Sequence, residues 1–331
     1  MPNENIVGRV SIVAPLYNEE DVIEPLYEKL REAMDALGRP VEAILVNDGS
    51  IDATAERLDQ IADRDDRFTI IHLRRNFGQT AALAAGFDQA RGEVIVAMDA
   101  DLQNDPADIP AMLQKLEEGY DVVSGWRRRR KDPWLTRKLP SSIANWIISK
   151  VTGVPLHDYG CSLKAYRAEV LRDVKLHGDM HRFIPALAHW AGGRITEMEV
   201  THHPRRYGKT KYSLTRILRV VFDLATVKFL LSYATRPLQV FGLWGLVAGG
   251  LGFLLALYLT VQKLIFGAHL SDRPALLLAV LLILMGFQLV TMGLIAELQA
   301  RTYYEAQNKP PYTIRYVKYK AGRIREAFPG D

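Results

Sequence analysis

The sequence has little cysteine and lacks two signals that would place it in common protein classes. Cys161 is the only cysteine among 331 residues, so the chain has no intrachain disulfide and suits a reducing compartment. Residues 1–10 lack a cationic start followed by an apolar run, which predicts that no signal peptide is present. Residues 14–21, APLYNEED, follow the first apolar run without a glycine. This excludes the G-x-G-x-x-G motif of dinucleotide-dependent oxidoreductases.

Charged residues are absent from two long apolar segments near the C-terminus. Residues 237–262 and 274–296 contain no Asp, Glu, Lys or Arg, and each exceeds the roughly 20 residues with which a helix spans a bilayer. The connection between them is short, which predicts a transmembrane hairpin with both ends on one side. A pair of buried core helices is the alternative, although uncharged core helices of this length are uncommon.

The net charge is small, but the positive residues are unevenly distributed. The net charge of +4 suits a protein that lies against an anionic membrane surface. Because no nucleic-acid-binding motif accompanies it, nucleic acid is not predicted to be a partner. The hairpin connection holds Lys263 and Arg273, whereas seven cations follow the second span: Arg301, Lys309, Arg315, Lys318, Lys320, Arg323 and Arg325. Because positive residues stay in the cytoplasm, the large N-terminal domain and the C-terminal tail are predicted to be cytoplasmic.

Apolar β-rich runs alternate with amphipathic helical stretches in the first half of the chain. The runs are RVSIVAPLY, VEAILVND, FTIIHL, EVIVAMDAD and DVVSGW, and the helical stretches lie near 20–37, 52–64, 79–91 and 107–118. This pattern predicts an α/β fold with a mostly parallel sheet and helices on both faces. Polar motifs follow four of the runs, where ligands bind in such folds: PLYNEE, NDGSIDAT, RRNFGQT and DADLQNDP.

The segment MDADLQNDP, residues 98–106, places two carboxylates one residue apart directly after a predicted strand. Alternate residues of an extended chain project the same way, so Asp99, Asp101 and Gln103 would present oxygens to a hard cation such as Mg²⁺ or Mn²⁺. Such a cation keeps positions open for phosphate oxygens. Taken alone, the pair is equally consistent with a helix cap. We expect Asp105 to cap the helix that follows.

Six motifs in this order resemble the family 2 glycosyltransferases of GT-A fold, specifically the polyprenyl-phosphate glycosyltransferases. They are VAPLYNEE, VNDGSIDAT, LRRNFGQTAAL, MDADLQNDP, DYGCSLKAYR and RRYGKTKY. The resemblance covers about residues 8–235, where the chain is similar to dolichyl-phosphate mannose synthase. The overall layout, with two spans after this domain, is similar to that of bacterial undecaprenyl-phosphate sugar transferases.

This resemblance implies an activity and a cellular location. The activity is an inverting transfer of a sugar from a nucleotide diphosphate sugar to polyprenyl (undecaprenyl) phosphate, for cell-envelope glycan or lipid modification. A UDP-sugar is the favoured donor, with a GDP-sugar as the alternative, and Mg²⁺ or Mn²⁺ is the cofactor. The location is the bacterial inner (cytoplasmic) membrane. The identity of the sugar does not follow from these motifs.

The resemblance also implies roles for individual residues. The donor nucleotide would contact Pro15, Tyr17, Glu19, Asp48, Asn76, Gly78 and Asp99. Asp99, Asp101 and Gln103 would hold the metal, and Asp99, Asp101 and Asp158 are the candidate catalytic residues. Asp158 matches an acidic position near the transferred sugar, but a lipid phosphate is already an anion, so a general base is not required. A solvated loop or cap residue is the alternative for Asp158.

Cations are needed because an anionic phosphate must approach an anionic donor. The candidates for binding the acceptor phosphate are Arg127, Arg205, Lys209 and Lys211. Arg205 resembles a family arginine that contacts this phosphate, although Arg206 beside it leaves the assignment ambiguous by one residue.

The chain is therefore predicted to contain four parts. Residues 1–211 form the catalytic domain, 212–235 form amphipathic juxtamembrane helices, 236–298 form the hairpin and 299–331 form a basic cytoplasmic tail. An amphipathic helix packed on its own domain is the alternative for 212–235. The glycines of GLVAGGLGF allow close helix packing and hence a homo-oligomer.

Two other functions are compatible with parts of the sequence. A processive polysaccharide synthase also joins a family 2 domain to membrane helices, but such enzymes carry a Q-x-x-R-W motif and more spans, neither of which this sequence has. A non-catalytic membrane scaffold or sugar-nucleotide sensor would not require the acidic motifs that are intact here.

Overall fold

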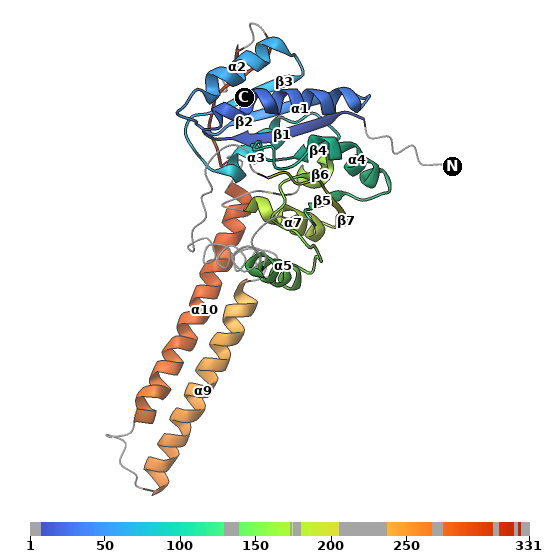
Figure 1. The fold of residues 1–331 in the computed structure, drawn as a ribbon. Helices are drawn as coiled ribbons and strands as arrows, with labels where there is room; N and C mark the ends of the chain where they lie inside the picture. The colour runs from blue at the N-terminus through green and yellow to red at the C-terminus, as the bar shows by residue number, and fades with distance from the viewer. Residues whose placement is uncertain are drawn as a thin grey trace. The chain divides into compact units, whose positions relative to one another are not determined.

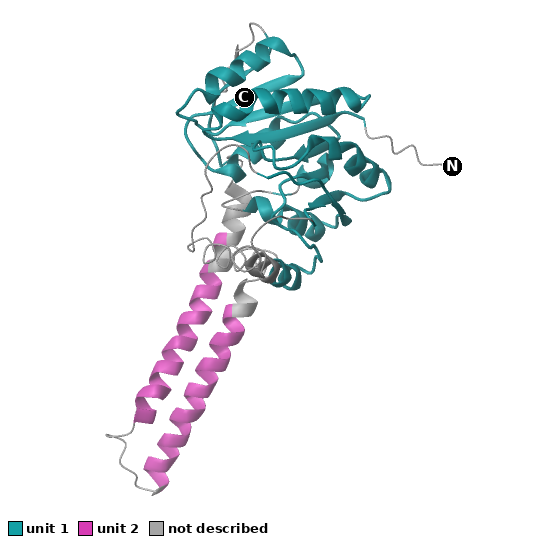
Figure 2. Ribbon diagram, in the orientation of Figure 1, with its two compact units in different colours: residues 1–224, 310–331 teal, residues 225–309 magenta. Residues whose placement is uncertain are grey.

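The computed structural model divides the chain into two compact units (Figure 2). Unit 1 contains residues 1–224 and 310–331, and unit 2 contains residues 225–309. The structure describes residues 8–128, 139–172, 174, 180–204, 237–266, 274–306, 311–320 and 324–325. The predicted juxtamembrane helices at 212–235 lie outside these described residues.

Unit 1 is built around one sheet with the strand order β7-β5-β6-β4-β1-β2-β3-β8-β9 (Figure 1). The strands are β1 (Val10–Leu16), β2 (Val41–Asn47), β3 (Phe68–Leu73), β4 (Val94–Ala97), β5 (Val122–Trp126), β6 (Lys164–Arg167), β7 (Ile195–Glu199), β8 (Ile314–Lys318) and β9 (Ile324–Arg325). All of them run in one direction except β6 and β8, which pair antiparallel with their neighbours. The predicted mostly parallel sheet is confirmed.

Helices cover both faces of this sheet. They are α1 (Ile23–Ala36), α2 (Thr54–Arg64), α3 (Gln79–Gln89), α4 (Ile109–Glu117), α5 (Leu139–Thr152), α6 (Ala168–Arg172) and α7 (Ile184–Trp190), with 3₁₀ turns η1 (Glu20–Val22), η2 (Pro106–Asp108) and η4 (Met180–Phe183). One core contains apolar side chains of α1, α2 and α4, such as Leu26, Leu58 and Met112. The other contains side chains of α3 and α7, such as Ala82 and Ile184.

The central strands are mostly apolar because both of their faces are buried. Six of the seven residues of β1 are buried, as are all four of β4. Parallel sheets enclosed by helices have this continuous apolar pattern. The polar motifs predicted from the sequence follow the strands, so most of the candidate site residues of unit 1 lie at one edge of the sheet.

Strand β8 changes the predicted division of the chain. The sequence predicts a separate basic tail over residues 299–331, whereas Ile314–Lys318 form a strand that pairs antiparallel with β3. Tyr312 and Val317 are buried in the core that also contains α3. The last part of the chain thus belongs to the same compact unit as the N-terminal half.

Unit 2 is an antiparallel pair of long helices, α9 (Pro237–Phe266) and α10 (Pro274–Ala306). Both contain apolar stretches long enough to cross a membrane, Phe241–Ile265 and Pro274–Ile295, and of an 18-residue apolar segment within each only 22% and 11% of the residues are buried. A core helix of a soluble protein would be mostly covered. Uncovered apolar side chains on both helices are instead what a membrane-spanning hairpin presents to lipid.

Glycines let the two helices of unit 2 approach closely. A Cβ on Gly286 of α10 would lie 2.6 Å from the carbonyl oxygen of Gly245 and 2.6 Å from the nitrogen of Gly249, both on α9. A Cβ on Gly250 would meet no atom within 4 Å. The glycines that the sequence analysis relates to a homo-oligomer therefore serve mainly the packing of α9 on α10 within one chain.

Candidate active site at the carboxyl edge of the sheet

Most of the predicted site residues lie at the carboxyl edge of the parallel strands. Residues 17–19 follow β1, residues 48–50 follow β2, residues 76–78 lie between β3 and α3, and residues 99–103 follow β4. Strand β6 runs the opposite way, so residues 158–162, which precede it, reach the same edge. Arg127 follows β5 there as well.

The segment from Asp99 to Gln103 forms a turn. The prediction of an extended segment, made from the alternate positions of Asp99, Asp101 and Gln103, is therefore wrong. Leu102 has a φ of 57°, a left-handed conformation that costs a non-glycine residue about 1–2 kcal/mol. This bend folds Gln103 back on Asp101, whose carboxylate accepts hydrogen bonds from Gln103 N at 3.2 Å and from Gln103 Nε2 at 2.5 Å. The Gln103 amide thus holds Asp101 through its nitrogen.

Asp99 occupies a crowded position beside this turn. Its Oδ1 accepts a hydrogen bond from Gln79 Nε2 at 2.7 Å, and its backbone N donates to Ser162 Oγ at 3.3 Å. Burial, followed by the negative charge of Asp101, raises the pKa of Asp99 above its usual value. Two carboxylates that disfavour each other's charge are a site where a bound cation relieves the repulsion.

The donor set of this site is incomplete without a further ligand. Within the described ranges, no group of three or more His, Cys, Asp or Glu side chains is placed to hold a metal ion. Asp99 and Asp101 alone supply two carboxylates, and Mg²⁺ or Mn²⁺ commonly takes its remaining oxygens from water and a substrate diphosphate. The residues present therefore fit a hard divalent cation that binds together with a phosphorylated substrate.

Asp158 and Arg127 form a buried ion pair. Arg127 donates from Nε to Asp158 Oδ2 at 2.8 Å and from Nη2 to Oδ1 at 3.1 Å, and Gly160 N donates to Oδ1 at 3.1 Å. Burial opposes the charge of Arg127, but the bidentate pair raises its pKa well above the ordinary value. Because both carboxylate oxygens accept hydrogen bonds, Asp158 is better placed to orient Arg127 than to remove a proton.

The loop after β2 is held by backbone groups of the loop after β3. The carboxylate of Asp48 is buried and accepts hydrogen bonds from Phe77 N at 2.7 Å and from Gly78 N at 2.9 Å. Burial raises the pKa of Asp48, although these two N–H groups oppose that shift. A nucleoside contact by Asp48 stays a prediction, since the structure shows it fixing the start of α3.

Close backbone contact explains the glycine in NDGS. Gly49 has a φ of 66°, and a Cβ there would lie 2.3 Å from the carbonyl carbon of Arg75. No other residue fits this approach without moving the chain. Asn76 Nδ2 donates to Asp48 O at 3.4 Å from the same side. The structure therefore brings three predicted donor-binding residues, Asp48, Asn76 and Gly78, into one interlocked pair of loops.

The loop after β1 lies against the loop after β2. Asn18 N donates to Ser50 Oγ at 2.9 Å, and Glu19 N donates to Thr54 Oγ1 at 3.0 Å. Tyr17 is 37% exposed at this edge, whereas Pro15 is half-buried within β1. Tyr17 and Glu19 therefore border the same edge as Asp48.

Lys164 is a site residue that the sequence analysis missed. Its buried ammonium group donates to Tyr159 O at 3.2 Å and to Arg182 O at 3.4 Å. Burial lowers the pKa of Lys164 to about 8. The available signal was a lysine in the otherwise apolar strand LKAY, where an interior cation is costly.

The basic acceptor candidates are only partly described. Arg127 lies at the carboxyl edge of the sheet, whereas Arg205, Lys209 and Lys211 fall outside the described residues. His203 N donates to Gln103 O at 2.8 Å, two positions before Arg205 in the chain. Asp105 Oδ1 accepts a hydrogen bond from Ala107 N at 3.0 Å, which confirms Asp105 as the predicted cap.

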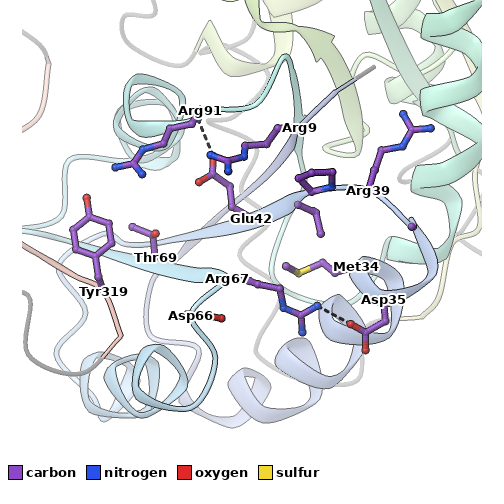
Figure 3. Close-up of a pocket in the computed structure, with 13 residues that line it drawn as sticks. Arg9, Met34, Asp35, Arg39, Glu42, Asp66, Arg67, Thr69, Arg91 and Tyr319 are labelled. Atoms are coloured by element: carbon purple, nitrogen blue, oxygen red, sulfur yellow. Dashed lines mark hydrogen bonds and ion pairs between the residues drawn. The ribbon is translucent and has the colours of Figure 1, made fainter. Parts of the chain in front are cut away.

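A separate pocket of about 680 Å³ lies at the amino ends of the strands, away from this edge (Figure 3). It is lined by residues that begin or precede strands, such as Val41 and Arg67, and by several further charged side chains. Figure 3 shows Arg67 pointing at Asp35, to which it donates at 2.6 Å. Glu42 Oε1 accepts from Arg91 N. None of the predicted site residues lines this pocket, and much of its charge is paired internally.

Comparison with known proteins gives both the family and the fold. Residues 11–175 match the family described as glycosyl transferase family 2. The chain is 47% identical to dodecaprenyl-phosphate galacturonate synthase of Rhizobium johnstonii, over 93% of this chain and 92% of that protein. It is 41% identical to undecaprenyl-phosphate 4-deoxy-4-formamido-L-arabinose transferase of Proteus mirabilis, over 94% of each.

Solved structures show the same fold at lower identity. Glucosyl-3-phosphoglycerate synthase from Mycobacterium tuberculosis, in complex with Mn²⁺ and UDP-glucose, matches with a TM-score of 0.52 and 18% identity, over 67% of this chain and 79% of that one. Mannosyl-3-phosphoglycerate synthase from Rubrobacter xylanophilus matches with a TM-score of 0.55 and 15% identity, over 67% and 74%. The predicted GT-A fold is confirmed. On the family match and these relatives, the chain, which holds Asp99, Asp101 and the Arg127–Asp158 ion pair at its carboxyl edge, belongs to glycosyl transferase family 2 and is a glycosyltransferase.

Proposed function

We propose that this glycosyltransferase moves a sugar from a nucleotide diphosphate sugar to polyprenyl phosphate at the cytoplasmic face of a bacterial inner membrane. The observation that supports it most is the meeting of Asp99, Asp101 and the Arg127–Asp158 pair at one sheet edge, in a chain that also carries an apolar hairpin. The relatives from Rhizobium and Proteus are named for transfer to polyprenyl phosphates. The Mycobacterium structure is a complex with UDP-glucose, which supports a UDP-sugar as the donor of this chain.

The residues of the site divide the work between donor and acceptor. Asp99 and Asp101 would hold Mg²⁺ or Mn²⁺, which neutralises charge on the departing nucleoside diphosphate when it is bound. The loops of Asp48, Asn76 and Gly78 hold the nucleoside. Arg127, kept in place by Asp158, draws the lipid phosphate toward the donor.

The acceptor needs no general base. A phosphate monoester is an anion at neutral pH, so its oxygen attacks the anomeric carbon directly. The new carbon–oxygen bond forms as the bond to the nucleoside diphosphate breaks, and the configuration at the anomeric carbon inverts. This reaction fits a site in which both carboxylate oxygens of Asp158 already accept hydrogen bonds from Arg127 and Gly160.

The test is transfer by the purified full-length protein in lipid nanodiscs. The reaction contains undecaprenyl phosphate, Mn²⁺ and, in separate tubes, UDP-galacturonate, UDP-4-deoxy-4-formamido-L-arabinose, UDP-glucose and GDP-mannose, and the lipid product is detected by mass spectrometry. We expect one UDP-sugar to give a lipid with one added sugar. Asp101→Asn should reduce transfer by at least about 10²-fold, as should excess EDTA, because charge stabilisation at the leaving group is lost.

Asp105→Asn is the matched control for that variant. It lies on the same loop, keeps a side-chain oxygen for the cap and should retain near-normal transfer. Near-normal turnover of Asp101→Asn, or full activity in EDTA, would remove the metal role. A long polymer product would favour a processive synthase instead.

A further inference from the structure

A network of polar side chains connects β8 to the loop after β2, and its members His72 and Asn47 are buried while Asp59 and Tyr316 are half-buried. Tyr316 of β8 lies opposite His72 of β3 in the strand pairing, and their rings stack at 4.3 Å between centroids with an interplanar angle of 22°. Tyr316 also donates its hydroxyl hydrogen to Asp59 Oδ2 at 3.1 Å. His72 is buried, and its Nε2 lies 3.1 Å from Asp59 Oδ1. Tyr316 therefore holds the histidine from two sides.

The hydrogen bonds of Asn47 determine how His72 is protonated. Ser50 N donates to Asn47 Oδ1 at 3.0 Å, so the amide nitrogen of Asn47 faces His72 Nδ1, 3.0 Å away. An amide N–H needs an acceptor, and Nδ1 is therefore unprotonated while Nε2–H donates to Asp59. Each side chain in the hydrogen-bonded series Tyr316, Asp59, His72 and Asn47 then has a matching donor or acceptor.

Asp59 is kept ionised by this arrangement. Burial favours its neutral form, but the hydrogen bonds from His72 and Tyr316 hold the pKa of Asp59 below its usual value. Burial, together with the nearby Asp59 carboxylate, raises the pKa of Tyr316 to about 12, so the phenol stays a donor. Asp59 therefore stays an acceptor and the Tyr316 hydroxyl stays a donor at neutral pH.

The far end of the network is the loop that the proposed function assigns to the nucleoside. Asn47 is the last residue of β2, it precedes Asp48 directly, and its Oδ1 closes the turn through Ser50 N. Ser50 Oγ in turn accepts from Asn18 N on the loop after β1. The position of residues 47–50 therefore depends on a side chain more than 260 residues later in the chain.

We propose that Tyr316 is a positioning residue for the donor nucleotide, acting through Asp59, His72 and Asn47 on the loop of residues 47–50. This inference rests on the proposed function for its ligand, a nucleoside diphosphate. Tyr316 does not touch the reacting atoms. Its role is to hold the turn in the conformation that binds the nucleoside before the nucleotide arrives, and removing it should weaken donor binding more than it slows the chemical step.

A second tyrosine on the same segment supplies a matched control. Tyr312 donates its hydroxyl hydrogen to Asp88 Oδ2 at 2.6 Å, and Asp88 belongs to the last turn of α3 rather than to the His72 network. Tyr316→Phe and Tyr312→Phe each remove one hydroxyl bonded to one carboxylate. Phenylalanine keeps the ring at either position, including the stacking on His72.

The experiment compares these variants in the full-length protein by two measurements. Hydrogen exchange without ligand reports the order of residues 47–50 directly, and titration with UDP in the presence of Mn²⁺ reports the affinity of the site. We expect Tyr316→Phe to speed exchange at residues 47–50 and to raise the Kd of UDP about threefold to tenfold, with a raised KM for the donor and little change in kcat. Tyr312→Phe should leave the exchange at residues 47–50, the Kd of UDP and the KM for the donor at wild-type values.

The two measurements separate the failure of this inference from the failure of the proposed function. Unchanged exchange at residues 47–50 in Tyr316→Phe, or equal changes in both variants, would overturn the positioning role. Faster exchange in Tyr316→Phe alone, in a protein that binds neither UDP nor GDP, would confirm that Tyr316 orders the loop and would refute the assignment of that loop to a nucleotide.

Discussion

At the scale of single residues, the structure shows that several predicted site residues act through one another. Gln103 holds Asp101, Asp158 holds Arg127 and Asp48 holds the start of α3. Sequence motifs identify which residues belong to the edge because polar residues at strand ends are conspicuous. They do not reveal that Leu102 adopts a left-handed conformation, since a leucine is unfavourable there and only the surrounding packing imposes it.

The Arg127–Asp158 pair gives a prediction that separates a positioning carboxylate from a general base. Asp158→Asn leaves Arg127 buried without its counter-charge, which should lower stability by about 3–5 kcal/mol and transfer by at least tenfold. The double variant Asp158→Asn/Arg127→Gln should recover much of the stability, because no uncompensated charge remains, but none of the transfer. Thermal unfolding and transfer assays measure both effects.

The pH dependence of the same variants tests the role of Asp158. If Asp158 only orients Arg127, the transfer rate of Asp158→Asn should run parallel to that of the wild type from pH 6 to 9. A general base would give a different profile, in which the loss shrinks as hydroxide replaces the missing carboxylate at high pH. Convergence of the two profiles at high pH would contradict the positioning role.

At the scale of elements, the central strands and their helices were predictable, while β8 was not. Continuous apolar runs such as EVIVA identify a buried parallel strand in any context. The strand IRYVK instead alternates with cations and reads as part of a basic tail, and its partner β3 lies about 240 residues earlier. Pairing over that separation depends on the finished sheet, so no local pattern indicates it.

The packing of α9 on α10 gives a prediction at the same scale. Gly286→Leu places a side chain against the backbone of Gly245 and Gly249, so it should force the helices apart and destabilise unit 2 by about 1–3 kcal/mol. Gly250→Leu adds the same side chain where a Cβ meets no atom within 4 Å, and it should leave stability near the wild-type value. Thermal unfolding in detergent compares them. Equal unfolding temperatures for the two variants would show that these glycines do not bring the helices together.

At the scale of the whole molecule, the hairpin is an insertion within a discontinuous catalytic unit. Residues before and after it belong to unit 1, because β8 and Tyr312 join the same sheet and core as residues 10–200. A folded unit cannot contribute strands from both sides of a membrane. The strand pairing therefore predicts that the two ends of a membrane-spanning hairpin lie on one side, whichever way the positive residues direct it. This conclusion depends on the strand pairing and is independent of the charge argument made from sequence.

Cysteine labelling in intact bacterial cells tests this topology together with its predicted direction. The native Cys161 is 1% exposed, so it should contribute little background. Ser271→Cys lies in the connection between the spans and should react with a membrane-impermeant maleimide added outside spheroplasts. Thr313→Cys, which precedes β8, should react only after the membrane is opened. The shared sheet places residue 313 on the same side of the membrane as the N-terminal half of the chain. The positive-inside charges predict that this side is the cytoplasm, so labelling of Thr313→Cys from outside would contradict the charge argument.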